Sequence, residues 1–179
     1  MEIRVYFEGN RTLRPGFASF FRELKAAAKR VQSSVEFIAA KDGPSDYRKA
    51  ARTHPLAWNI LLKDSEEPMP AHPATLCKRH GIDASLVNNV FWMVELMESW
   101  FLAHPEALAA YYGKDFSVNA LGQTADVERV PKSDVLRRLQ QATKSTSKGR
   151  YDKVAHAPHL LETVGCRSSA AARAELPHA

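Results

Sequence analysis

Three carboxylates crowd the end of an apolar run in the stretch NILLKDSEEP, residues 59–68. Asp64, Glu66 and Glu67 directly follow Leu61 and Leu62, a pair typical of the inside of a sheet. Carboxylates this close together repel one another unless water screens them or a cation lies among them. We favour the cation, because carboxylate oxygens are the ligands that hard divalent ions such as Mg²⁺ or Mn²⁺ prefer.

The segments around this cluster predict strands and helices in alternation. Short runs rich in β-branched and aromatic residues predict strands over 3–7, 35–40 and 58–64. Amphipathic spacing predicts a helix over 17–30 and a second from Ser45 to His54, capped by the Ser45 hydroxyl. This order is typical of an α/β, Rossmann-like fold with a mainly parallel sheet and helices on both faces.

The second half of the chain is predicted to add one strand and more helices. Residues 87–113 are apolar nearly all round, which fits either one buried helix or, as we favour, a strand over about 89–96 followed by a helix. Pro131 and Ser133 open an amphipathic helix, and 159–164 suggests a short one. The polar stretch 144–156 is predicted to be a loop, and the last dozen residues a helix. We predict a single domain over residues 1–179.

Composition limits the class of protein. The chain has 179 residues, 45% of them hydrophobic and 25% charged, which suits one globular core. No segment approaches the roughly 20 apolar residues that would cross a bilayer, and the start MEIRVYFEG lacks the features of a secretion signal. With only Cys77 and Cys166, we expect a cytoplasmic protein without a disulfide framework and without a membrane partner. The formal charge of +5 permits a nucleic-acid partner.

Parallel strands would gather the acidic residues at one place. In an open α/β sheet, ligands bind outside the carboxyl ends of the strands. Glu8 follows the first predicted strand, and Asp64 and Glu66 follow the third. We therefore expect these three carboxylates to surround one spot that could bind Mg²⁺ or Mn²⁺.

Four blocks of the sequence resemble a known family. They are YFEG (6–9), LLKDSEEP (61–68), MESWFLA (97–103) and SKGRYDKVAH (147–156). Together and in this order, the blocks resemble an uncharacterised bacterial family of TOPRIM-like proteins, which are commonly encoded beside ATPases of the ABC or AAA type.

The resemblance implies a set of site residues. The implied metal ligands are Glu8, Asp64, Glu66 and Glu98. The family's late block, KG-x-Y-x-K-x-x-H, is matched by Lys148, Tyr151, Lys153 and His156, which become the candidate catalytic residues. The sequence departs from many TOPRIM domains in two ways: Glu66 stands where an aspartate is common, and the basic segment GNRTLRPG (9–16) replaces an acidic one.

The chemistry implied by these residues is cleavage of a phosphodiester. Two divalent ions stabilise the attacking and leaving oxygens of a phosphoryl displacement. Lys148 or Lys153 would neutralise charge in the transition state, and His156 would exchange a proton with the departing oxygen. Each acid also has a structural alternative: a solvated strand end for Glu8, a screened loop for 64–67, and a water-facing polar arc for Glu98.

Two functions follow from the sequence. The first is a metal-dependent nuclease, acting on DNA or RNA as the effector of an ATPase-linked anti-phage defence system. The alternative is a non-catalytic subunit that docks on the partner ATPase or binds nucleic acid without cutting it. A phosphoaspartyl receiver domain fits less well, because Glu98 and the late block have no place in it.

Overall fold

A computed structural model describes residues 1–70, 72–123 and 125–165 of the chain. Its centre is a sheet of four strands in the order β2-β1-β3-β4, in which every neighbouring pair is parallel. The strands are β1 (Glu2–Glu8), β2 (Ser34–Ala40), β3 (Trp58–Asp64) and β4 (Val90–Met93). The predicted α/β, Rossmann-like class with a parallel sheet is confirmed.

Helices follow each strand. The α-helices are α1 (Arg14–Phe20), α2 (Arg22–Arg30), α3 (Gly43–Thr53), α4 (Ala74–Arg79), α5 (Ser99–Leu102), α6 (Pro105–Tyr112), α7 (Lys132–Thr143) and α8 (Lys153–Gly165). Short 3₁₀ helices are η1 (Arg11–Leu13), η2 (Ala84–Asn89), η3 (Val118–Leu121) and η4 (Val127–Arg129).

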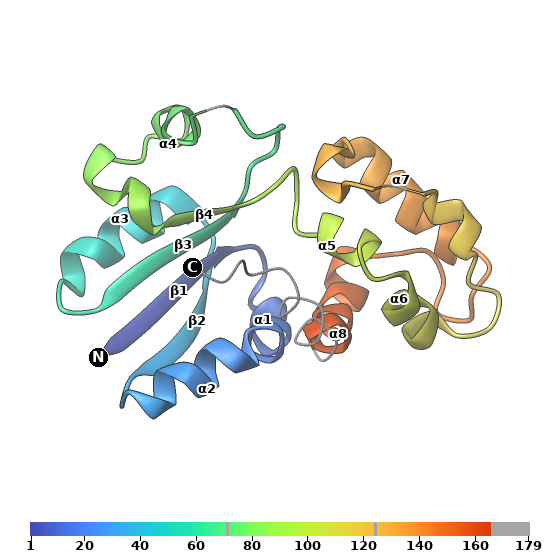
Figure 1. Cartoon of the computed structure of the whole chain (residues 1–179), viewed down its shortest axis with the longest axis horizontal. Helices are drawn as coiled ribbons and strands as arrows, with labels where there is room; N and C mark the ends of the chain where they lie inside the picture. The colour runs from blue at the N-terminus through green and yellow to red at the C-terminus, as the bar shows by residue number, and fades with distance from the viewer. Residues whose placement is uncertain (71, 124, 166–179) are drawn as a thin grey trace, which may run out of the picture.

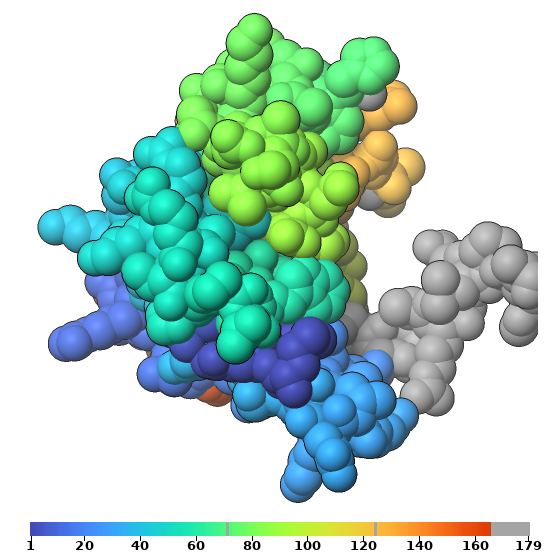
Figure 2. Space-filling model, turned by 90° about the vertical axis from the view of Figure 1, so that its left-hand side faces the viewer, coloured from blue at the N-terminus to red at the C-terminus, as the bar shows by residue number. Residues whose placement is uncertain are grey.

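The sheet is covered on both faces, as Figure 1 shows. On one face, α1 and α2 bury Phe7 and Phe37 together with Phe17. On the other face, α3 places Tyr47 in the core that also contains Tyr6 and Leu61. Figure 2 looks at the amino ends of the strands, where the dark blue start of β1 lies between the cyan segment of α3 and the blue segment of α2.

The apolar run in β3 is explained by this double cover. Successive side chains of a strand point to opposite faces. Leu61 therefore belongs to the core beneath α3, and Leu62 to the core beneath α1. Both faces need apolar residues, so a central parallel strand has a continuous hydrophobic run rather than an alternating one.

Beyond the carboxyl ends of the strands lies a cluster of helices, α5 to α8 (Figure 1). Its buried residues Phe101 and Leu160 belong to the same core as Phe7 and Phe17 of the sheet layer. Helix α8 also packs directly on α1. The helical cluster is thus joined to the sheet through one continuous core, and it covers the edge where the acidic residues were expected.

The N-terminal helices differ in detail from their prediction. The expected helix over 17–30 is two helices separated at Phe21, whose backbone has φ −94° and ψ 28°. At the break, Phe20 stacks on Trp100 at 4.8 Å and Phe21 stacks on Phe37 at 5.6 Å between ring centres, and Phe21 also meets Trp100 edge-on at 6.4 Å. The predicted Ser45 cap is wrong, because α3 already begins at Gly43 and its N-cap is Asp42.

The later segments confirm one preference and correct another. Residues 87–113 contain a strand and then helices, although β4 has only four residues and the helical part is divided into α5 and α6. The predicted loop over 144–156 is too long, because α8 begins at Lys153. Asp152 accepts a hydrogen bond from the Ala155 amide at 2.8 Å and so caps this helix.

Two further predictions concern cysteines and termini. Cys77 is a buried free thiol, whereas Cys166 and the predicted C-terminal helix lie outside the described residues. Among the helices of the described residues, none has both the length and the apolar character needed to cross a membrane.

The crossing of α1 and α8 is predicted to depend on Gly16. A Cβ atom at this position would lie 2.7 Å from the Pro158 carbonyl oxygen and 2.9 Å from Leu161 Cβ. We expect Gly16→Ala to lower the free energy of unfolding by about 1–3 kcal/mol, because backbone atoms of α8 would have to shift. Urea denaturation followed by circular dichroism measures this.

Gly43→Ala is the matched control, since its added Cβ would meet only Leu61 Cδ1, at an ordinary 3.8 Å. It is expected to leave stability unchanged or slightly higher. Equal effects of the two substitutions would contradict the tight crossing.

Candidate metal centre

Glu8 and Asp64 are the last residues of the two central strands, β1 and β3. The parallel register pairs Phe7 with Leu62, so these two strands end at the same edge of the sheet. The carboxyl edge of an open α/β sheet is where ligands gather. The backbone therefore brings both acids to the expected place.

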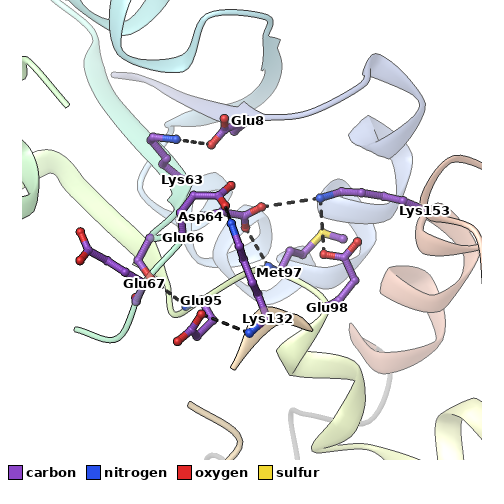
Figure 3. A network of polar contacts seen from close by, with 11 residues as sticks. Glu8, Lys63, Asp64, Glu66, Glu67, Glu95, Met97, Glu98, Lys132 and Lys153 are labelled. Carbon is purple, nitrogen blue, oxygen red and sulfur yellow. Dashed lines mark hydrogen bonds and ion pairs between the residues drawn. The ribbon is translucent and has the colours of Figure 1, made fainter. Parts of the chain in front are cut away.

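Strand alternation nevertheless separates their side chains. Asp64 points to the face of Leu62, beneath α1, whereas Glu8 and Lys63 share the face of Tyr6 and Leu61. Lys63 Nζ donates a hydrogen bond to Glu8 Oε2 at 2.5 Å (Figure 3). The Glu8 carboxylate is thus held by a buried lysine of its own, although its charge is still near enough to Asp64 to add to the rise in the pKa of Asp64.

The loops after β3 and β4 are joined by hydrogen bonds. The Ser65 amide donates to the Met93 carbonyl at 2.9 Å, and the Glu95 amide donates to Ser65 Oγ at 2.7 Å. Glu66 and Glu95 both have left-handed backbones, with φ of 62° and 59°, a conformation that costs free energy outside glycine. The Met97 amide then donates a hydrogen bond to Asp64 Oδ1 at 2.8 Å. This bond holds the chain beside Asp64 at the residue that directly precedes Glu98.

Asp64 and Glu98 converge on one ammonium group, that of Lys153 (Figure 3). Lys153 Nζ lies 3.6 Å from Asp64 Oδ2 and 3.4 Å from Glu98 Oε2. Tyr151 donates a hydrogen bond to Glu98 Oε1 at 3.0 Å. Glu98 Oε2 has no hydrogen-bond partner among the described residues, although Glu98 is only 1% exposed.

Burial shapes the ionisation of this group. It raises the pKa of Asp64 from 3.8 to about 6, with Lys153 opposing the rise and Glu98 adding to it. Burial disfavours the charged form of Lys153 as well, yet Glu98 and Asp64 raise its pKa above the ordinary value. The pKa of Tyr151 is raised by burial and by the neighbouring Glu98. Lys153 therefore stays charged and Tyr151 stays a hydrogen-bond donor at neutral pH.

A cavity of about 490 Å³ opens beside the convergence point. Its polar lining includes Asp64, Glu66, Glu98, Lys132 and Lys153. Lys132 donates to Glu66 Oε2 at 2.5 Å, and its backbone amide donates to Glu95 Oε2 at 3.2 Å. Glu66 thus lines the same cavity as Asp64, but it is held by its own lysine.

The donor set fits a divalent ion in part. Asp64 and Glu98 offer buried carboxylate oxygens, and the hydrogen-bond capacity of Glu98 Oε2 is unfilled. This is the chemistry that Mg²⁺ and Mn²⁺ require. Within the described parts of the chain, however, no three such residues form a ready cluster. The positive charge that the acids need is provided by lysines instead.

The late block is divided between this centre and the helical cluster. Tyr151 and Lys153 contact Glu98, as described above. Lys148 Nζ instead lies over the Tyr111 ring, 5.1 Å from its centre. His156 Nδ1 accepts hydrogen bonds from the Asp152 amide and Tyr112 hydroxyl, both at 3.0 Å, and burial lowers its pKa. Its place is at the start of α8, where it supports the helix.

Sequence reasoning missed the lysines that neutralise the acids. Lys63 lies inside the quoted block LLKDSEEP, and a lysine within a buried strand is itself a signal that a carboxylate is near. Lys132 had no such signal, because it comes from a helix 66 positions after its partner Glu66. The structural alternative for Glu98, a polar arc facing water, is wrong, because Glu98 is buried.

The comparisons with known proteins identify the family. The model of a family described as Domain of unknown function (DUF4276) matches residues 9–177. The chain belongs to this family. Asp64, Glu66, Glu98 and Lys153 all fall inside the DUF4276 match, and Glu8 directly precedes it. Neither the curated proteins nor the solved structures gave a match.

The raised pKa of Asp64 predicts how stability depends on pH in this DUF4276 domain. With a pKa of about 6 in the folded protein against 3.8 ordinarily, the folded state binds more protons between about pH 4 and 6. Stability should therefore fall as pH rises through this window and level off above it. Asp64→Asn should remove about 1–3 kcal/mol of that fall.

Chemical denaturation in a chelator at a series of pH values tests this dependence. Asp134→Asn is the control, because Asp134 is in an exposed pair with Arg137. It should retain the wild-type slope between pH 4 and 6. A slope unchanged by Asp64→Asn would contradict the assignment.

The hydrogen bond to Glu98 is predicted to matter more than an ordinary tyrosine contact. Tyr151→Phe would remove the donor to a buried carboxylate, and we expect a loss of about 2–3 kcal/mol in unfolding free energy. Tyr47→Phe removes a bond to the neutral Leu86 carbonyl at 3.3 Å and should cost about 1 kcal/mol. Thermal and urea unfolding of both variants compares them; equal losses would argue against a charged acceptor.

Proposed function

We propose that the chain is a TOPRIM-like nuclease that cleaves phosphodiesters with Mg²⁺ or Mn²⁺. The observation that carries this proposal is the pair of buried carboxylates, Asp64 and Glu98, beside an open cavity at the carboxyl edge of a parallel sheet. Glu98 Oε2 accepts no hydrogen bond among the described residues and has an ion pair with Lys153 at 3.4 Å, so a buried carboxylate oxygen is left with hydrogen-bonding capacity that a cation could use. This arrangement is best explained by a site that binds a divalent ion.

Asp64 and Glu98 would hold the ion, with Glu66 on the wall of the same cavity. When bound, such an ion supplies Lewis acidity toward a phosphoryl oxygen and lowers the pKa of water. Tyr151 orients Glu98 through its hydrogen bond, and the Met97 amide orients Asp64. Glu8 stands across the sheet edge and would join only if it left Lys63.

The surroundings suit a phosphate-containing substrate. Lys132 and Lys153 line the cavity, so positive charge lies beside the carboxylates. On the Glu8 side, a second open basin of about 590 Å³ is lined by Arg11 and Lys41. Phosphate backbones are bound through such lysines and arginines. The basic segment after β1 is consistent with a nucleic-acid substrate passing along this edge.

The proposed partner and biological role come from the resemblance of the four sequence blocks to TOPRIM-like proteins. TOPRIM-like relatives are commonly encoded beside ABC or AAA-type ATPases, and we propose such an ATPase as the partner. The nuclease would then act as the effector of an anti-phage system. Lys148 and His156 are left without a chemical role in this proposal, because their contacts lie in the helical cluster.

One observation favours the alternative, a non-catalytic subunit that docks on the ATPase or binds nucleic acid without cutting it. Each acid already has a lysine within ion-pair distance: Lys63 for Glu8, Lys132 for Glu66, and Lys153 for Asp64 and Glu98. A site neutralised in this way is stable without metal. The two functions are separated by activity.

Cleavage of plasmid, single-stranded DNA and tRNA in Mg²⁺ or Mn²⁺ tests the nuclease proposal. We expect wild-type protein to cut at least one substrate, and Asp64→Asn and Glu98→Gln to lose about 100-fold or more of that rate. Glu106→Gln is the matched control, because Glu106 is an exposed residue in the first turn of α6. It should cut like wild type.

Two outcomes would count against the proposal. Cleavage that persists in both Asp64→Asn and Glu98→Gln would rule out this metal centre. No cleavage by wild type, even when the partner ATPase is present, would favour the non-catalytic subunit.

A further inference from the structure

Lys153 differs from the other lysines of the site in how it holds its acids. Its Nζ lies 3.4 Å and 3.6 Å from the Glu98 and Asp64 oxygens, beyond the roughly 2.7–2.9 Å of a charge-assisted hydrogen bond. Lys63 and Lys132 each contact one acid directly, at 2.5 Å. Lys153 is therefore shared between two carboxylates, at longer distances than those at which Lys63 and Lys132 hold their single partners.

The side chain of Lys153 is partly exposed and borders an open cavity. It is 44% exposed, whereas the side chain of Lys63 is 6% exposed. Its stem borders the cavity of about 490 Å³, whose wall includes the apolar Leu96 and Leu136. The long aliphatic stem of lysine packs on such surfaces while its charge moves to water.

The backbone of Lys153 does not depend on that contact. Lys153 is the first residue of α8, and Asp152 caps this helix through the Ala155 amide. His156 Nδ1, one turn further along, accepts a hydrogen bond from the Asp152 amide. The ammonium can thus leave the acids without unwinding the helix that carries it.

We propose that Lys153 is the resident cation of the acidic centre, and that a divalent metal ion binds only by displacing its ammonium from between Asp64 and Glu98. This inference rests on the proposed function, since it concerns the same two acids. The site then has two states, lysine in and metal in. The apparent metal affinity is then the intrinsic affinity multiplied by the fraction of molecules in which the lysine has left.

The two states make opposite demands on residue 153. In the metal-free protein, loss of the ammonium leaves two buried carboxylates that repel each other, which is destabilising. In the presence of metal, the same loss removes the competitor. A lysine with a purely structural role would change stability without tightening metal binding.

The test compares Lys153→Met with wild type by calorimetric titration of Mn²⁺ into the full chain and by thermal unfolding in a chelator. We expect Lys153→Met to bind Mn²⁺ about tenfold more tightly or better. Its metal-free melting temperature should fall by roughly 3–10 °C, and saturating Mn²⁺ should abolish most of the deficit.

Lys148→Met is the matched control, because Lys148 belongs to the same late block as Lys153 but its ammonium lies over the Tyr111 ring in the helical cluster. It should change the Mn²⁺ affinity by less than about threefold. Lys153→Gln, whose neutral head can still hydrogen-bond, provides the same reading if the methionine variant does not fold. Binding of Mn²⁺ by a Lys153 variant but not by wild type would be the strongest support.

Two results would overturn the inference, and they differ in whether the proposed metal site also fails. If wild type and the Lys153 variants bind Mn²⁺ equally, or the variants bind more weakly, the displacement is wrong while the metal site stands. If none of the folded proteins binds Mn²⁺, the proposed metal-dependent function fails together with it. Metal binding without any nuclease activity would leave the displacement intact and remove only the catalytic role.

Discussion

The structure depends on the pairing of carboxylates with lysine ammonium groups at the carboxyl edge of the sheet. A parallel sheet brings the ends of β1 and β3 together, and both strands end in an acid. Buried carboxylates destabilise a fold unless they are paired and hydrogen-bonded. Lys63, Lys132 and Lys153 provide that pairing, and each comes from a different part of the chain. The fold can therefore keep its acids in place without a bound metal.

This pairing links stability to chemistry. The acids that fit a divalent ion best, Asp64 and Glu98, are also the ones whose lysine is shared and loosely held. The supporting contacts are firmer: Tyr151 holds Glu98, the Met97 amide holds Asp64, and the left-handed residues Glu66 and Glu95 lie in loops tied together by Ser65. The surrounding shell is thus fixed, while the cation at its centre is the component with room to exchange.

Much of this fold was predictable from the sequence because its signals are local. β-Branched and aromatic runs located the first three strands, the fourth was the favoured of two interpretations of an apolar stretch, and the strand–helix alternation indicated a parallel sheet. The same reasoning failed where packing overrides local pattern. One expected helix is divided into two at Phe21, where Phe20 stacks on Trp100 and Phe21 stacks on Phe37. A polar stretch expected to be a loop becomes the start of α8, where Asp152 and His156 cap the helix.

The sequence by itself determined that acids end the central strands, that Glu98 and Lys153 belong to motif blocks, and that the family domain spans most of the chain. Only the tertiary structure decided which of these residues meet. Strand alternation gives Glu8 and Asp64 different lysine partners, although the Glu8 charge still raises the pKa of Asp64. Helix α8, packed against α1, then brings Lys153 to Asp64 and Glu98 across a long sequence separation. Such contacts depend on the packing of distant segments, and local sequence patterns do not encode them.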